Sequence, residues 1–173
     1  KPLLEPGIGH RLDDDYFKRI EAVEFAVKND DGQDANSFFK ADVVLVGLSR
    51  TSKTPRSMYL AHKGVKVANL PLVPSIDPPS EINSVDPRRV FALTVSLDAL
   101  VKIRRARLRH LGLPESADYA TRESVATELR WVEEFYQRHP EWKCFDVTNR
   151  AIEETAAEIL RVYNTHFADN ATA

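Results

Sequence analysis

Cysteine is almost missing from this sequence, which holds one cysteine among 173 residues. A lone cysteine, Cys144, excludes an internal disulfide and argues against a cysteine-based zinc site. A chain of this length buries a sufficient core without either kind of cross-link. The sequence therefore fits a reducing compartment, and Cys144, in a short apolar stretch, is predicted to be buried and inert.

Long apolar runs and an excess of one charge are missing too. The longest apolar runs cover about six residues, whereas a membrane span needs roughly 20. The chain has 24 basic and 26 acidic residues, a net charge of −2. Balanced charge gives no global signal for nucleic acid or a membrane surface, and no signal peptide opens the chain. We therefore expect neither kind of partner.

Apolar runs alternate with amphipathic stretches along the chain. Strands are expected at 41–47, 65–70, 90–95 and 143–147, and helices at 13–28, 54–63, 96–110, from 121 onward and at 149–163. Ser96 and Thr121 have the side chains that cap helix N-termini. The first helix should bury Tyr16, Ile20, Val23 and Val27, and the prolines between 71 and 87 indicate a loop that cannot be a central strand.

This alternation predicts an α/β domain whose mostly parallel sheet is flanked by helices. The chain begins abruptly and reads as part of a longer protein. We divide it into an N-terminal linker and helical segment (1–35), a P-loop domain (36–167) and a frayed tail (168–173).

The segment that carries chemistry follows the first expected strand. Residues 47–54 match the P-loop pattern G-x-x-x-x-G-K-[ST] at every defined position except one, where Ser52 replaces the second glycine. In such a loop, backbone N–H groups and a helix N-terminus bind phosphates. Lys53 would reach the terminal phosphates and the Thr54 hydroxyl would help to hold Mg²⁺. The alternative is a strand–turn–helix crossover with solvated side chains, and the β-carbon of Ser52 could crowd the loop.

The wider sequence resembles the pyruvate, phosphate dikinase regulatory proteins, the sister family of the phosphoenolpyruvate synthase regulators. The resemblance covers nearly the whole chain and rests on the segments 12–22, 25–32, 49–55, 59–61, 66–74 and 146–156. Ser52 looks like the choice of this family, and the chain looks like the C-terminal catalytic part of its longer members. The proline-rich 73–79 segment is closer to the dikinase branch.

The resemblance implies a bifunctional enzyme. Such proteins phosphorylate a threonine of the dikinase with ADP as donor, and remove that phosphate with inorganic phosphate, releasing pyrophosphate. The resemblance assigns the nucleotide site to Gly47, Leu48, Ser49, Arg50, Thr51, Ser52, Lys53 and Thr54. It implies that ADP, inorganic phosphate and Mg²⁺ bind there. It also implies a cytoplasmic bacterial protein, or a chloroplast one in a plant, and leaves homo-oligomers possible.

Further charged residues have two interpretations each. Arg50 could clamp the transferred phosphoryl group or be an exposed surface arginine. Asp30 and Asp31 could supply the base for the threonine hydroxyl or a metal ligand, or form a turn; we take Asp31, with Lys53 and Arg50, as catalytic. The cations between Lys102 and Arg109 form a solvated helix face or receive an anionic partner.

Two other functions stay open at this point. One is an ATP-dependent P-loop kinase of a small molecule, and the other is a nucleotide-binding module that regulates without catalysis. Nucleotide preference separates the first from an ADP-dependent enzyme, and phosphate transfer to a target separates the second.

Overall fold

The computed structural model describes residues 8–167, with side chains from residue 13 onward. It contains one four-stranded sheet in which every neighbouring pair is parallel. The strands are β1 (Val43–Leu48), β2 (Val67–Leu72), β3 (Val90–Thr94) and β4 (Lys143–Asp146), in the order β2-β1-β3-β4. The predicted α/β class with a parallel sheet is confirmed.

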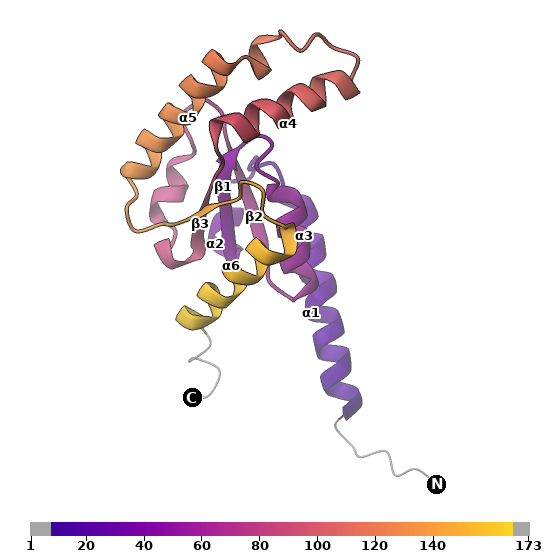
Figure 1. Ribbon diagram of the computed structural model, residues 1–173. Helices are drawn as coiled ribbons and strands as arrows, with labels where there is room; N and C mark the ends of the chain where they lie inside the picture. The colour runs from indigo at the N-terminus through magenta and orange to yellow at the C-terminus, as the bar shows by residue number, and fades with distance from the viewer. Residues whose placement is uncertain (1–7, 168–173) are drawn as a thin grey trace.

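Helices cover both faces of the sheet (Figure 1). They are α1 (Ile8–Lys28), α2 (Ser37–Lys40), α3 (Lys53–His62), α4 (Leu97–His110), α5 (Arg122–Gln137) and α6 (Ile152–Phe167), with 3₁₀ turns at Ser80–Ser84, Pro87–Arg89 and Asp118–Ala120. On one face α3 packs against α6 and α1. The chain moves from β3 to β4 in the opposite direction from its move from β1 to β2. Because such crossovers are right-handed, α5 lies on the other face.

The strand order creates a switch point at the centre of the sheet. The chain leaves β1 toward β2 on one side and later returns to β3 on the other side. Ligands of open α/β sheets bind in the crevice beyond the carboxyl ends of two such strands. The turn between β1 and α3, residues 49–52, lies at this position.

Most predicted elements are present with boundaries shifted by a few residues. Ser96 caps α4 by accepting a hydrogen bond from the Ala99 N–H, and Thr121 caps α5 through the Ser124 N–H. The core is formed by the strands, of which β1 is buried along its whole length. Such burial on both faces is typical of a central parallel strand.

Pro71 corrects the expected end of the second strand. It lies inside β2, opposite Gly47 of β1, rather than in a loop. The N–H of Asn69 points away from β1 and donates to the carbonyl of Asn29 at 2.9 Å. Because alternate residues of a strand point the same way, the ring nitrogen of Pro71 also faces outward and costs the sheet no hydrogen bond. The strand is at the edge, so the expectation that proline avoids a central strand is confirmed.

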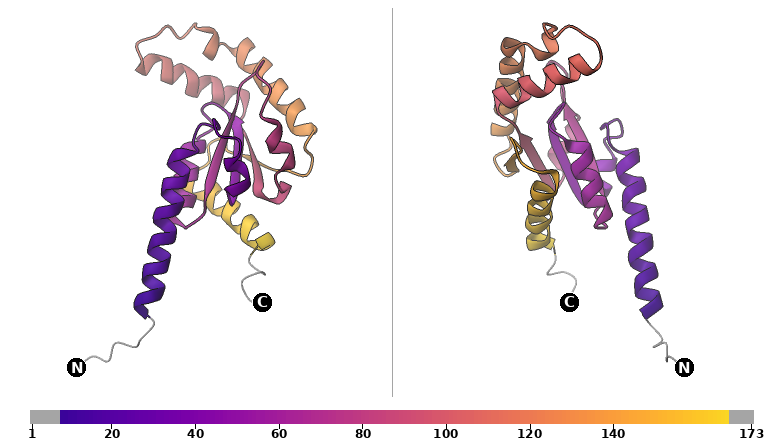
Figure 2. Two further views of the ribbon diagram at one scale, coloured as in Figure 1. Left: turned by 180° about the vertical axis from the view of Figure 1, so that it is seen from behind. Right: turned by 45° about the vertical axis from the view of Figure 1, so that its right-hand side comes forward.

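The buried face of α1 differs from the prediction. Its contacts with α3 are made by Ala22 and Ala26, which pack against Ala61. Of the residues expected on that face, Val23 packs against this cluster, whereas Tyr16 is 54% exposed and Val27 64% exposed. Figure 2 shows why, because α1 runs past α3 and extends beyond the sheet.

Cys144 is exposed, contrary to prediction. It lies on β4, an edge strand in which the side chain of Phe145 alone is buried. An edge strand buries fewer side chains than the short apolar pattern indicates.

In the described part of the chain, no helix is both long and apolar enough to cross a membrane.

Candidate functional site

The segment that matches the P-loop pattern, residues 47–54, here called the P-loop, connects β1 directly to α3, as the sequence predicts. Gly47 is the last but one residue of β1, and a β-carbon there would lie 2.8 Å from Thr51 Oγ1. That distance is too short for any side chain, so the tight turn requires glycine. Two residues of the turn, Arg50 and Ser52, have positive φ angles of 68° and 58°.

Ser52 occupies the position where the general P-loop pattern has glycine. Its φ of 58° and ψ of 41° are left-handed, a conformation that is most readily adopted by glycine. The backbone therefore has a conformation that suits glycine, although the residue is serine. Strain of this kind clusters at ligand sites.

Lys53 is held against the loop from which it projects. Its Nζ donates to the Leu48 carbonyl at 2.7 Å and to Thr51 Oγ1 at 3.3 Å, while Thr51 Oγ1 donates to the same carbonyl. Burial lowers the pKa of Lys53 to about 8, against a smaller opposite effect of Asp30. The ammonium is thus poorly hydrated, and an anion in the loop would stabilise its charge.

A carboxylate from a distant segment of the chain accepts a hydrogen bond from the first turn of α3. Asp30 lies in the loop after α1, and its Oδ1 accepts hydrogen bonds from Thr54 Oγ1 at 2.8 Å and Asn69 Nδ2 at 2.6 Å. Asn69 is buried on β2. A P-loop hydroxyl beside an aspartate is the pair that holds Mg²⁺ in P-loop enzymes, so these oxygen ligands fit that ion.

Asp31 takes a different position from its neighbour. It is exposed, and its Oδ1 accepts from the Gln33 N–H at 3.2 Å, as in an Asx turn. The structure thus brings Asp30 to the P-loop and leaves Asp31 beside it in the turn. The catalytic role expected of Asp31 stays a prediction.

A buried arginine on α4 reaches the other side of the loop. Arg104 is 2% exposed; its guanidinium lies 2.7 Å from Glu128 on α5, donates to the Tyr119 carbonyl and contacts Ser49 Oγ at 3.4 Å. The cations of α4 were expected to form a solvated face or to receive an anionic partner. Instead, Arg104 is an internal brace of the loop, whereas Lys102 and Arg105 are exposed.

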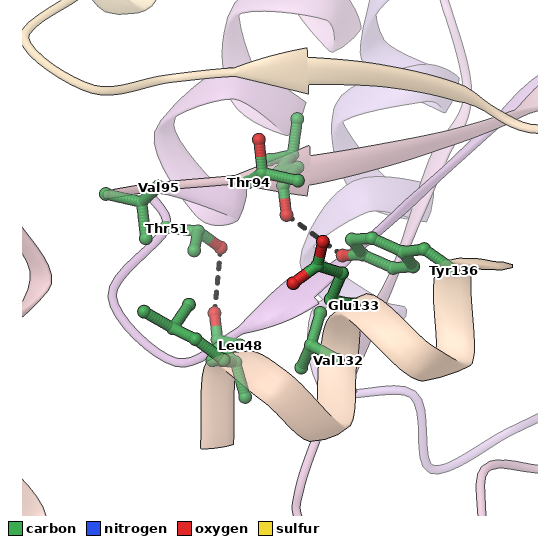
Figure 3. A pocket seen from close by; sticks show the side chains of 9 residues that line it. Leu48, Thr51, Thr94, Val95, Val132, Glu133 and Tyr136 are labelled. Carbon is green, nitrogen blue, oxygen red and sulfur yellow. Dashed lines mark hydrogen bonds between the residues drawn. The ribbon is translucent and has the colours of Figure 1, made fainter. Parts of the chain in front are cut away.

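A cavity of about 390 Å³ opens at the switch point between β1 and β3. Leu48, Thr94 and Val132 line it, and the carboxylate of Glu133 points into it from α5 (Figure 3). The Tyr136 hydroxyl lies 2.9 Å from the Leu93 carbonyl and 3.1 Å from that of Val46. Burial raises the pKa of Tyr136, so its phenol remains a donor to the strand ends.

The sequence identified the loop but not the residues that support it. Asp30 was singled out only as one of a pair, and Arg104 only as one of several cations. Glu133 and Tyr136 carry no local signal, because their relation to the loop arises from the packing of α5 on the sheet. Among the described residues no cluster of three or more His, Cys, Asp or Glu side chains could hold a metal, so any Mg²⁺ would depend on phosphate oxygens as further ligands.

Comparison with known proteins extends the resemblance seen in the sequence. A "Putative pyruvate, phosphate dikinase regulatory protein" from Geotalea daltonii is 52% identical over 169 residues, which are 98% of this chain and 63% of that protein. Proteins of the same name from Sorangium cellulosum and Oceanobacillus iheyensis are 53% and 49% identical, covering 92% and 93% of this chain and 57% and 59% of their own lengths. The chain thus spans about three fifths of the length of these relatives.

The match to a whole family agrees with these pairwise similarities. The sequence model of the kinase/pyrophosphorylase family covers residues 1–160, which include α1, the P-loop and the buried Arg104. The predicted resemblance is confirmed, and the chain belongs to the kinase/pyrophosphorylase family.

Proposed function

We propose that this chain carries the phosphoryl-transfer site of a regulator of pyruvate, phosphate dikinase. In one direction it transfers the β-phosphoryl group of ADP to a threonine of the dikinase. In the other it transfers the phosphoryl group of that phosphothreonine to inorganic phosphate. The observation that carries this proposal is the P-loop with Lys53 buried against it and Asp30 hydrogen-bonded to Thr54.

In the kinase direction, the threonine oxygen attacks the β-phosphorus of ADP. The new O–P bond forms while the bond between the β-phosphorus and the bridging oxygen breaks, and AMP leaves with that oxygen. The hydroxyl proton passes to a carboxylate, for which Asp31 is our predicted base. Backbone N–H groups of the loop, Lys53 and Arg50 offset charge on the phosphate oxygens.

A divalent cation supplies further charge neutralisation when it is bound. Thr54 and Asp30 would be its ligands from this chain, because hard oxygen donors suit Mg²⁺. Asn69 holds the Asp30 carboxylate in position through a 2.6 Å hydrogen bond.

In the phosphorylase direction, an oxygen of inorganic phosphate attacks the phosphorus of phosphothreonine. The P–O bond to threonine breaks, threonine recovers a proton, and pyrophosphate leaves. The sequence contains one P-loop, so we expect the same N–H groups and Lys53 to hold the attacking phosphate. ADP and the attacking inorganic phosphate should therefore compete for the loop.

An assay of both directions tests the proposal. The protein, at this length and at the length of its relatives, is incubated with dikinase and ADP, with ATP as the control donor. Phosphorylated dikinase is separately incubated with phosphate, and mass spectrometry of the target threonine reports both reactions. Phosphorylation that prefers ATP would favour a conventional kinase, and ADP binding without transfer at either length would favour a non-catalytic module.

A further inference from the structure

A second cavity of about 380 Å³ lies on the other side of the P-loop. It is formed where the loop and α3 meet α4 and the segment that joins β4 to α6. Its cationic lining residues are Arg50, Arg56, Lys102 and Arg150, and none of the described residues that line it is acidic. A cavity whose charged lining residues are all cationic concentrates anions.

The backbone around this cavity is unusually strained. Non-glycine residues with positive φ are Arg50, Ser52, Ser75 and Asn149 in the described chain. All of them except Ser75 line this one cavity. Left-handed residues cost free energy and persist where the surrounding structure holds them, most often at ligand sites. Two separate segments therefore adopt costly conformations to face the same space.

A buried arginine forms part of the lining. Arg56 is 1% exposed, and its Nη1 donates to the carbonyls of Thr51 and Ser52. Its Nε is buried without a hydrogen-bond partner. Burial and the nearby Arg150 lower the pKa of Arg56, which means that the two guanidinium groups repel. An anion between them would relieve that repulsion.

Arg150 precedes α6 and is fixed in place by carboxylates of that helix. Its Nη2 contacts Glu154 at 3.2 Å and Glu158 at 2.7 Å on α6. These carboxylates do not line the cavity, so they orient the arginine without filling the space. Lys102, on α4, is exposed and has a free ammonium among the described residues.

We propose that this cavity is a phosphate-binding subsite distinct from the P-loop itself. It would take a phosphate dianion while the loop holds the nucleotide, and this role rests on the function proposed above. Two sources share that chemistry: the phosphothreonine side chain of the target and free inorganic phosphate. Arg56 and Arg150 form its rigid part, and Lys102 supplies a mobile charge at its mouth.

Binding measurements with ADP present test the subsite. Inorganic phosphate and O-phospho-L-threonine are titrated separately by calorimetry into the chain saturated with ADP, with threonine as the blank. Lys102→Gln should weaken the affinity for the anion about tenfold, the scale of one charge-assisted hydrogen bond. Arg105→Gln is the matched control, because Arg105 is exposed on the same helix outside the cavity.

The outcomes separate the source of the phosphate from the existence of the subsite. Binding of phosphothreonine assigns the cavity to the target, and binding of phosphate alone assigns it to the free ion; either supports the subsite if it depends on Lys102. No binding of either probe, or equal loss in both variants, would overturn it. Lys53→Ala should lose ADP but keep the anion in the cavity, so the two sites are tested independently. A wild-type chain that fails to bind ADP would count against the proposed function and not against the subsite.

Discussion

The hydroxyl of Thr54 donates a 2.8 Å hydrogen bond to Asp30, which lies 24 residues earlier in the chain. The same carboxylate oxygen accepts from Asn69 on β2. The first turn of α3, the loop after α1 and the edge strand therefore meet at one carboxylate. The N-terminal helical segment thus contributes directly to the P-loop.

Replacing this carboxylate and replacing its neighbour should impair phosphoryl transfer in different ways. Asp30→Asn removes the charge beside Thr54, and we expect the kinase rate to fall by about 10² or more, with a higher Mg²⁺ requirement. Asp31→Asn is the paired variant, and a loss of similar size there would establish Asp31 as the base. Rates measured across a Mg²⁺ titration distinguish the two. Unchanged rates in both variants would remove the pair from the mechanism.

ADP affinity should depend on pH through Lys53. Its pKa is lowered to about 8, mainly by burial, so the lysine loses its charge as the pH rises through that value. We expect ADP binding, measured by calorimetry between pH 6.5 and 9.5, to weaken above about pH 8. Lys53→Arg should flatten this dependence, and Lys53→Ala should weaken binding at every pH while the fold persists. A wild-type curve parallel to that of Lys53→Arg would contradict the assignment.

The same lysine affects stability with a definite sign. Because its pKa is lower in the folded state than the ordinary value of 10.5, the unfolded chain binds more protons between about pH 8 and 10.5. Stability should therefore rise with pH across this window. The difference in unfolding free energy between wild type and Lys53→Met isolates that contribution from other groups.

Ser52→Gly should stabilise the protein. The left-handed conformation of Ser52 costs a non-glycine residue about 1 kcal/mol, and glycine adopts it freely. Chemical denaturation should show a gain of that size, with ADP affinity within a few-fold of wild type. Ser124→Gly, within α5, is the contrasting variant and should destabilise by about 0.5 kcal/mol. A loss of stability in Ser52→Gly would mean that the serine makes a compensating contact.

Glu128→Gln should destabilise the chain through Arg104. The guanidinium is buried and lies 2.7 Å from Glu128, so removing the carboxylate leaves a buried charge without its counterion. We expect a loss of about 3 kcal/mol in denaturant unfolding. Glu134→Gln, at an exposed position of the same helix, should change stability by less than about 0.5 kcal/mol. Equal effects would show that Arg104 is adequately held by the Tyr119 carbonyl.

The sequence predicts well where local patterns determine the structure. The apolar run of β1, the caps Ser96 and Thr121, and the loop between Gly47 and Thr54 all carry their signals within a few residues. The strand order does not, because it depends on crossovers between segments far apart. The switch point and the cavity beside Glu133 therefore required the structure.

Errors in the prediction came from reading periodicity as burial. The apolar face of α1 has a regular helical spacing, yet the small residues Ala22 and Ala26 make the close contact with α3. Cys144 follows the apolar pattern of a buried strand but lies on an edge. A pattern identifies which residues share a face, whereas burial depends on whether another element covers that face.

The outward ring of Pro71 has a consequence for association. An edge strand normally offers free N–H groups that can template a further strand from another molecule. On the outer side of β2 the N–H of Asn69 is already taken by Asn29, and Pro71 has none to offer. An incoming strand would find neither donor at these two positions, so β2 is protected against intermolecular sheet growth and the aggregation that follows from it.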